Sequence, residues 1–269
     1  MASRANFSFK AAHLKLLWLL LKRDLRLRYA GAGLGSLWNL FHPLLLFTVY
    51  ALVFGYFLRF KARLSGKEVD FLPFFFAGFW PWMAFNDGLV RCAYIVFEYA
   101  AVIKRVRFPA QILVPLATLA ALTPLLVGFF LLLIFLLWQG KAPPLQGLRL
   151  LCFFIPFGLQ MLLSLGLGFL IATLCVFVRD VQQLLPSFLN LWFFLTPVFY
   201  SLDIVPDWLR PFLAKNPWSV ILAWYRQIFL APKVLFGQGE GWVLALGLIL
   251  LAIGWWSFSR GARYFPDIL

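Results

Sequence analysis

Long apolar runs, separated by short charged or proline-rich breaks, dominate the chain. A helix of about 20 mostly apolar residues is long enough to cross the hydrocarbon core of a bilayer. The pattern predicts six membrane-spanning helices, over residues 36–58, 71–96, 109–138, 149–178, 184–200 and 241–259. We therefore expect an all-α polytopic membrane protein in which residues 1–269 form a single transmembrane domain.

The segment before the first predicted span is amphipathic. Leu14, Leu17 and Leu21 recur at the spacing of one helical face, whereas Lys15 and Lys22 lie away from it. A helix with such faces lies in the headgroup plane of a membrane. We predict an interfacial helix over residues 10–29. The alternative, a short extra span, is disfavoured because the lysines leave too short an apolar run.

Three connecting segments differ from the spans. Residues 98–107 are charged and short, which predicts a brief helix outside the bilayer. Residues 203–230 contain several prolines and charges, so their apolar pieces are too short to span. Such a segment favours a re-entrant pair of short helices, covered by protein on the lipid side. Arg59 to Asp70 is expected to be a polar loop that turns at Gly66.

A few residues inside the predicted spans also carry information. Asp87 is either a carboxylate that lines a pore or an ion-pair partner for Arg91 one turn later, and the second interpretation is favoured. Gly166 and Gly168 are expected to allow a close contact between helices. Both observations concern helix packing within the membrane, and neither points to a catalytic role.

Composition and charge support the membrane assignment. The chain is 63% hydrophobic and only 13% charged, whereas soluble domains are about 25% charged. The net charge of +14 arises mainly from basic residues that flank apolar runs. These residues suit anionic lipid headgroups, and no nucleic-acid partner is expected. Six spans place both termini on one side, and a modest excess of basic residues there favours the cytoplasm.

No motif for catalysis or metal binding is found. The phosphate-binding pattern G-x-x-x-x-G-K-[ST] is missing, so we do not expect this chain to hydrolyse ATP. Cys92, Cys152 and Cys175 lie in or beside apolar runs, and they are expected to be small buried residues. The two histidines, His13 and His42, are isolated. We therefore predict neither a catalytic residue, nor a metal site, nor a cofactor in this chain.

Aromatic residues are unusually frequent, at 19% of the chain with 32 phenylalanines. Their rings offer flat apolar faces that suit the C–H faces of sugars. The alternative is ordinary packing together with interfacial aromatic belts. The residues that we select as candidates for lining a channel are Trp38, Tyr50, Phe54, Trp192, Phe193 and Phe199.

A series of short motifs resembles a known family. The first motif is R-D-L-x-x-R-Y, which begins at Arg23. The second is L-G-x-L-W-x-L-x-x-P-L, which begins at Leu34. IKRVRFPAQILVP, VRD, WFFLTPVFY and the terminal FPDIL follow in order. Together they resemble the permease subunits of type-2 ABC exporters, especially those that export O-antigen, teichoic acid and capsular polysaccharides.

The resemblance implies partners and residue roles. Two copies would pair and bind two separate ATPase subunits, which bind ATP and magnesium. The segment 98–107 would dock on the ATPase, through Glu98, Tyr99, Ile103, Lys104, Arg105 and Arg107. The interfacial helix would border the access route of a lipid pyrophosphate, near Arg23, Arg26, Arg28 and Tyr29. Residues 203–230 would form an outer gate.

The resulting hypothesis is a subunit that exports a lipid-linked polysaccharide across the bacterial inner membrane, with ATP hydrolysis in a separate subunit. The permease itself would not be an enzyme. The alternatives are an exporter of capsular polysaccharide or of a small hydrophobic drug. A stand-alone carrier or an intramembrane enzyme is less favoured, because intramembrane charges are sparse and no catalytic motif is present.

Overall fold

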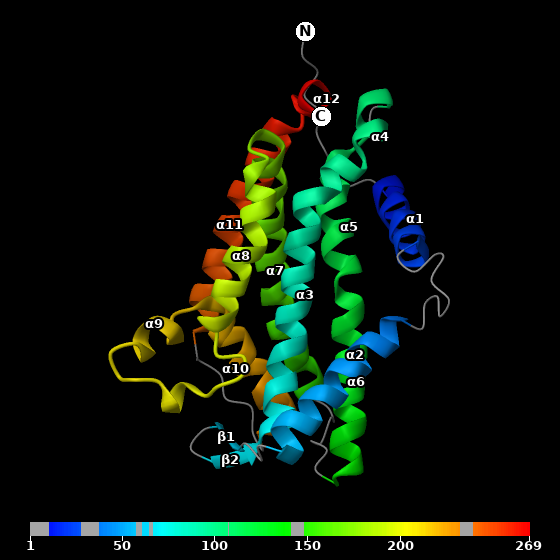
Figure 1. Ribbon diagram of the computed structural model, residues 1–269. Coiled ribbons are helices and arrows are strands. Elements are labelled where there is room, and N and C mark those ends of the chain that lie inside the picture. Colours follow the sequence, from blue (N-terminus) through cyan, green and yellow to red (C-terminus); the bar gives the residue numbers. More distant parts are fainter. Residues whose placement is uncertain are drawn as a thin grey trace.

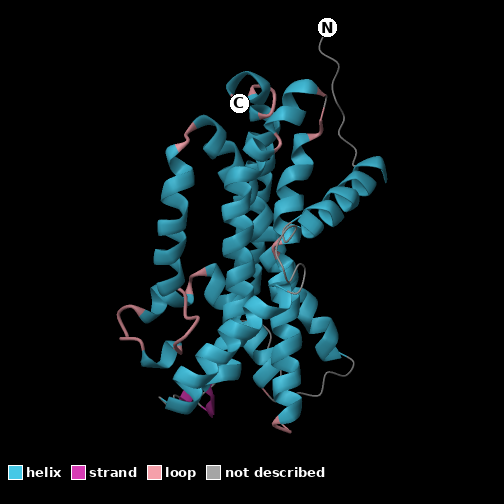
Figure 2. Ribbon diagram, turned by 45° about the vertical axis from the view of Figure 1, so that its right-hand side comes forward, coloured by secondary structure: helices cyan, strands magenta, loops and turns pink. Residues whose placement is uncertain are grey.

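Long helices that run side by side form the body of the protein, and short helices lie at both of its ends (Figures 1 and 2). The computed structural model describes residues 11–27, 38–57, 61–64, 67–106, 108–140, 148–231 and 239–269. The long helices of the body are α3 (Phe71–Glu98), α6 (Leu122–Trp138), α7 (Leu148–Phe177) and α11 (Glu240–Gly261). Apart from one small hairpin, the described elements are helices, as expected of an all-α membrane protein.

Three described helical stretches are long and apolar enough to cross a membrane, namely Ala110–Trp138, Leu151–Phe177 and Glu240–Gly261. The first contains a 3-10 turn (Ala110–Ile112) followed by α5 (Leu113–Ala120) and α6. α5 and α6 meet at Ala121, because Pro124 has no N–H to donate to the carbonyl of Ala120. The Thr123 hydroxyl donates to that carbonyl instead, at 3.3 Å.

The first apolar segment contains α2 (Trp38–Tyr50), which continues as a π-helix (Ala51–Phe57). α2 packs against α6, and the π-helix contacts α3. An antiparallel hairpin of β1 (Lys61–Leu64) and β2 (Lys67–Asp70) follows, with Lys61 paired to Asp70 and Leu64 to Lys67. The expectation of a loop over residues 59–70 is therefore wrong for the paired residues. The sequence Val69-Asp70-Phe71 carries no alternation long enough to reveal such short strands.

Two glycines allow α7 to approach its neighbours closely. A Cβ on Gly166 would lie 2.8 Å from the backbone nitrogen of Leu251 in α11. A Cβ on Gly168 would lie 2.9 Å from the Cys92 sulfur of α3. The predicted close contact is therefore confirmed, and it has two partners: Gly166 faces α11 and Gly168 faces α3.

α8 (Asp180–Phe194) begins directly after the charged turn that contains Arg179. It ends six residues before the predicted end of this span at residue 200. The reason is local: Thr196 precedes Pro197, and a residue before proline is driven out of the helical region. The Thr196 hydroxyl donates to the carbonyl of Trp192 at 2.8 Å as the helix ends.

Short helices follow α8. They are a 3-10 turn (Leu202–Ile204), α9 (Arg210–Ala214) and α10 (Pro217–Leu230). Asn216 caps α10, because its side-chain oxygen accepts from the backbone N–H of Trp218 at 3.1 Å. α9 is mostly exposed, whereas α10 packs against α3 and α7 and is buried along most of its length.

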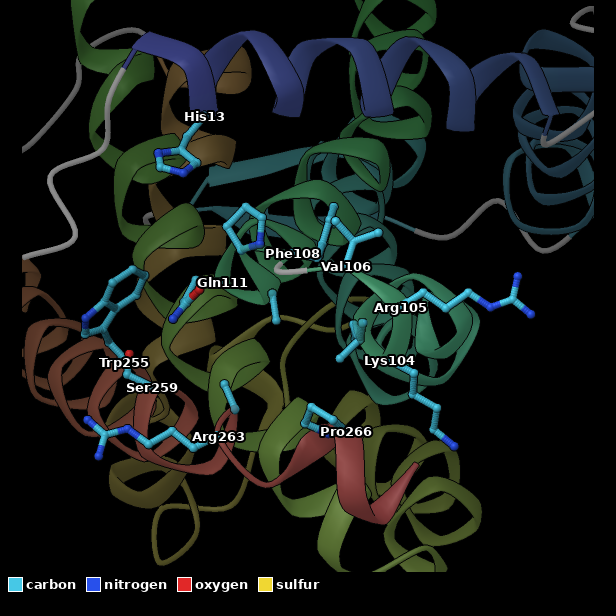
Figure 3. A pocket seen from close by; sticks show the side chains of 14 residues that line it. His13, Lys104, Arg105, Val106, Phe108, Gln111, Trp255, Ser259, Arg263 and Pro266 are labelled. Carbon is cyan, nitrogen blue, oxygen red and sulfur yellow. The ribbon is translucent and has the colours of Figure 1, made fainter. Parts of the chain in front are cut away.

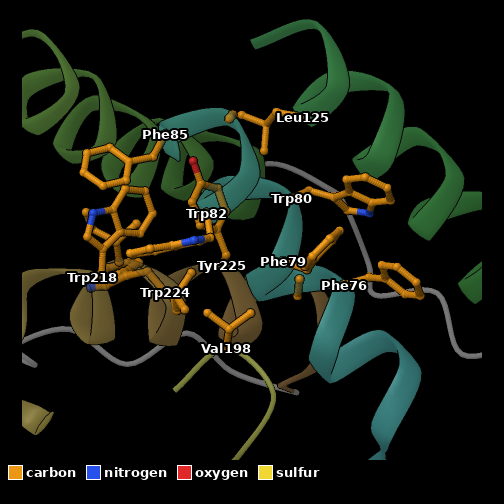
Figure 4. Packing of buried hydrophobic residues seen from close by; sticks show 14 of the residues in the cluster. Phe76, Phe79, Trp80, Trp82, Phe85, Leu125, Val198, Trp218, Trp224 and Tyr225 are labelled. Atoms are coloured by element: carbon orange, nitrogen blue, oxygen red, sulfur yellow. The ribbon is translucent and has the colours of Figure 1, made fainter. Parts of the chain in front are cut away.

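The main core is an aromatic cluster at the α9–α10 end of the bundle. Figure 4 shows rings from α3 and α10 meeting there, with Trp82 and Phe85 beside Trp218. The Phe85 and Trp218 ring centroids lie 4.5 Å apart. Offset and edge-on aromatic pairs add stabilisation beyond the area that they bury. This end of the protein is therefore held mainly by ring packing.

The opposite end contains α1 (Ala11–Leu27), α4 (Ala100–Arg105) and α12 (Phe265–Ile268) (Figure 1). Leu17, Leu20 and Leu21 of α1 pack against a second core cluster. Trp18 on the other side of α1 is 65% exposed. The helix is thus amphipathic in the structure, with an inner face that includes residues predicted from the leucine spacing.

Candidate functional site

Two polar contacts attach α1 to α3. The Arg91 guanidinium donates to both carboxylate oxygens of Asp24 at 2.8 Å, and each of these side chains is 18% exposed. Arg23 donates to the Tyr99 hydroxyl at 2.9 Å, and its guanidinium lies 5.5 Å from the Tyr99 ring centroid. We call these four residues the α1 clasp. Charge-assisted hydrogen bonds of this kind are stronger than neutral ones.

The clasp is attached at a break in the chain. Tyr99 is the residue at which α3 ends and α4 begins, and its φ of −99° and ψ of 11° are not those of a regular helix. Its side chain is buried, whereas the Arg23 side of the contact is more open. A movement of α1 would therefore act directly on the start of α4.

α4 has an inner apolar side and an outer charged side. Ile103 is buried, whereas Lys104 and Arg105 are exposed. α12 contacts α4, and its fully buried Phe265 belongs to the same core cluster as Ile103. The outer side of α4 is thus basic and open, while the inner side is fixed by packing.

The structure brings together two groups of residues that the sequence placed apart. Arg23, predicted at the lipid-pyrophosphate access route, touches Tyr99, which is predicted to contact an ATPase. Arg26 and Glu98 are exposed. Arg28, Tyr29 and Arg107 lie outside the described residues. The sequence analysis favoured Asp87 as the partner of Arg91, whereas the structure pairs Arg91 with Asp24. It missed Asp24, although a single acid among four cations in Lys22–Arg28 was a signal of a specific partner.

The aromatic candidates for channel lining occupy two places. Tyr50 and Phe54 contact the start of α3, where the Tyr50 and Phe75 centroids lie 4.7 Å apart. Trp192 and Phe193 pack edge-on or tilted against Trp82, at 5.8 and 5.9 Å. Phe199 packs against Phe193 in a tilted arrangement, with ring centroids 5.8 Å apart. The side chain of Trp38 is outside the described part of the chain. Within one copy these rings are half-buried, and lining a channel remains a prediction.

A buried cation joins three segments at the aromatic end. Arg226 of α10 is 5% exposed, and one of its nitrogens donates to the carbonyls of Pro197 and Val198 at 2.6 Å each. Its Nε donates to the carbonyl of Phe74 at 3.2 Å, and the guanidinium lies 3.6 Å from the Phe74 ring centroid. Arg226 thereby fixes the chain after α8 against α3 and α10. The sequence analysis counted this arginine only as one of several charges.

No metal site emerges among the residues that the structure describes. No group of three or more His, Cys, Asp or Glu side chains lies close enough there to hold a metal. Cys92, Cys152 and Cys175 are free thiols and are buried. The arrangement offers helix packing, a basic outward surface and aromatic rings, which suit binding and movement rather than bond chemistry.

Comparison with known proteins agrees with this interpretation. The chain is 29% identical over 239 residues to the O-antigen export system permease protein RfbA of Myxococcus xanthus, with 88% of each chain covered. It is 26% identical to RfbA of Klebsiella pneumoniae, covering 94% of this chain and 95% of that one. The chain is 21% identical to the polysialic acid transport protein KpsM of Escherichia coli, with 94% of each chain covered.

A family model provides the assignment. The model for the ABC-2 type transporter matches residues 15–230, from α1 through α10. This range contains the α1 clasp, α4 and the buried arginine, so the match covers the features described above. The chain belongs to the ABC-2 type transporter family, as a membrane permease of that family.

Proposed function

We propose that this chain is the transmembrane subunit of an exporter that moves a lipid-linked polysaccharide of the O-antigen kind across the bacterial inner membrane. A separate subunit would hydrolyse ATP. The observation that carries the proposal is the near full-length likeness to permeases named for O-antigen export, which covers 88–94% of this chain. The membership of the ABC-2 type transporter family supports it.

The proposed arrangement is a homodimer with two ATPase subunits and six spans in each permease. Both termini would be cytoplasmic, α1 would lie at the membrane surface, and α9 with α10 would form the outer gate. α1, α4 and α12 lie at one end of the bundle and α9, α10 and the hairpin at the other (Figure 1), which supports this orientation. No cofactor is assigned to this chain.

In this proposal α4 transmits the state of the ATPase. Its exposed Lys104 and Arg105 would contact the ATPase, as would Glu98. Arg107, which lies outside the described residues, is proposed to take part as well. The α1 clasp supports a mechanical link, because it joins the surface helix to Tyr99 at the start of α4. Cargo that approaches α1 could in this way influence the orientation of α4.

Arg26 is the described arginine of α1 that is exposed and is not a member of the clasp, so it is placed to meet an anionic lipid carrier. Arg side chains bind phosphate groups through paired hydrogen bonds. The polysaccharide would then pass the aromatic rings of α2, the π-helix and α8. The rings would offer apolar faces to the sugars without fixing any one position.

A second candidate is export of capsular polysaccharide, which the likeness to KpsM favours. Drug export and a stand-alone carrier or enzyme have weaker support, because no described feature favours them. The two polysaccharide proposals share a mechanism and differ in the glycan and its lipid anchor.

The test is deletion and complementation in cells that carry this gene. Loss of the chain is expected to remove the glycan from the surface and to leave lipid-linked polysaccharide inside. Complementation with Arg26→Gln is expected to restore export only in part, whereas Arg179→Gln should restore it fully. Surface glycan that persists without the chain would contradict the proposal. A capsule that is lost while the lipopolysaccharide remains intact would favour the second candidate.

A further inference from the structure

A cavity of about 900 Å³ lies between α1, α4 and the end of α11. His13 of α1 projects into it from above, while Gln111 and Trp255 project from the sides (Figure 3). Ser259 lies beside Trp255. The cavity is therefore a recess beneath the surface helix, with a mixed polar and apolar interior.

The rim of the cavity is basic. Lys104 and Arg105 extend from one side and Arg263 from the other, and the residues that line the cavity include no acid (Figure 3). In the sequence, the acid Asp267 directly follows the lining residue Pro266. Three flexible cations around an open recess favour an anionic ligand.

An apolar stripe leads from the side of α11 into the cavity. Leu248, Ala252, Trp255 and Ser259 follow one another at helical spacing. Leu248 is 52% exposed, so the residues that the structure describes leave the outer part of the stripe open. At the inner end Trp255 and Ser259 line the cavity. An apolar track that ends in a basic recess matches a molecule with an acyl tail and an anionic head.

The cavity also lies at the level expected for lipid headgroups. Arg260 lies over the ring of the neighbouring Trp256, at 4.4 Å from the ring centroid, and Trp256 is 56% exposed. Exposed tryptophans beside basic residues are typical of the membrane interface. Trp18 of α1 is exposed as well.

We propose that this cavity binds the headgroup of an anionic membrane phospholipid, whose acyl chains lie along the exposed stripe of α11. The phosphate would sit at the rim beside Arg263, and the rest of the headgroup would face Gln111 and Ser259. The bound lipid would fill the space beneath α1 and would support the position of α4. This site is distinct from the cargo and from the proposed access route at Arg26.

The experiment measures lipid retention by the full-length permease with its ATPase partner. The complex is purified in a neutral detergent and exposed to equal amounts of dioleoyl phosphatidylglycerol and dioleoyl phosphatidylcholine. Native mass spectrometry then counts the lipids that remain bound. The proposal predicts clear preference for phosphatidylglycerol in the unmodified complex.

Two variants test the cavity without altering the proposed ATPase contacts. Arg263→Gln removes one rim cation and is expected to lower the preference for phosphatidylglycerol about fivefold, the effect of one basic residue near an anionic surface. Ala262→Phe places a ring in the cavity and is expected to abolish the preference. The matched control Arg179→Gln removes an exposed arginine outside the cavity and should leave the preference unchanged.

Several outcomes would overturn the assignment. Equal retention of the two lipids by the unmodified complex would exclude an anionic site. An equal effect of Arg179→Gln would indicate general surface charge. Displacement of phosphatidylglycerol by an equimolar amount of undecaprenyl pyrophosphate would assign the cavity to cargo. If the permease alone retains phosphatidylglycerol and loses it when the ATPase binds, the cavity is part of the contact with the ATPase.

Discussion

α1 and α10 are two short helices with opposite surroundings. α1 has 17 residues, presents Trp18 and Arg26 to the outside, and is attached through the α1 clasp. α10 has 14 residues and is buried on nearly all sides, including the guanidinium of Arg226. The first therefore behaves as a surface helix and the second as part of the core.

The two helices differ in the surroundings of their charged side chains. The charged groups of the α1 clasp, on Arg23, Asp24 and Arg91, are at least partly exposed, so water can replace their partners when the contacts open. The donors of Arg226 are bound to carbonyls in an interior that offers little water, so opening would leave buried polar groups unpaired. We infer that the α1 end can move during a transport cycle, while the α10 end moves only as a unit with α3.

Replacing Arg226 with methionine is expected to have the largest effect. The change leaves the carbonyls of Pro197, Val198 and Phe74 without their side-chain donor. A buried polar group without a partner costs about 1–3 kcal/mol. The purified variant should therefore melt at a much lower temperature, as measured by tryptophan fluorescence, and give a reduced yield.

Arg226→Lys is the control for charge. Lysine retains the cation but lacks the planar fork that reaches several carbonyls at once. Its melting temperature should lie between those of the methionine variant and the unmodified protein. A methionine variant as stable as the original would show that α10 does not depend on this arginine.

Exchanging the charges of Asp24 and Arg91 should have the next largest effect. Asp24→Arg or Arg91→Asp alone places like charges together and should reduce ATPase stimulation by cargo, with smaller losses of stability. The double variant restores opposite charges and should recover much of the stimulation. The interaction energy from this cycle is expected to be about 1–2 kcal/mol. Losses that simply add in the double variant would refute direct coupling.

Tyr99→Phe sharpens the comparison, because it removes only the hydroxyl that accepts from Arg23. A hydrogen bond with one charged partner contributes about 1.5–3 kcal/mol, and we expect less here because the Arg23 side chain is exposed to water. We expect a modest loss of cargo-stimulated ATPase activity and little change in melting temperature. Tyr94→Phe is the matched control, because its hydroxyl is exposed and makes a long 3.4 Å contact with Gln182. Equal effects of both variants would remove the special role of Tyr99.

The smallest effect is expected in the hairpin, where Lys61 donates to Glu68 at 3.0 Å. This hydrogen bond, together with the nearby charge of Lys61, lowers the pKa of the Glu68 carboxyl. A lowered pKa means that the pair helps stability at neutral pH and loses that help as the pH falls through the lowered pKa. Because both side chains are exposed, Lys61→Gln should leave the melting temperature at neutral pH unchanged. A measurable drop would indicate a partner for the hairpin.

Local pattern was sufficient to predict several elements. The leucine spacing predicted α1, the prolines between residues 203 and 230 predicted short helices, and Gly166 and Gly168 predicted close packing. These features depend on neighbouring residues and on helical periodicity. The early end of α8 at Phe194 could have been anticipated from Pro197 by the same reasoning.

Contacts between distant residues could not be predicted in this way. Arg226 binds the carbonyl of Phe74, which lies 152 positions away, and a carbonyl carries no signature in a sequence. Asp24 and Arg91 were visible as charges, but their pairing requires the arrangement of α1 against α3. In the proposed homodimer the roles of the aromatic residues would also depend on the second copy, so their contribution to a channel remains a prediction.

The most direct test of the proposed mechanism is ATP-driven transport by purified components. Proteoliposomes would contain this chain alone, its ATPase partner alone, or both, together with a lipid-linked O-antigen-type polysaccharide. We predict that only the combination hydrolyses ATP in response to the glycan and moves it across the bilayer. ATP hydrolysis by the isolated chain, or transport without the ATPase, would contradict the account.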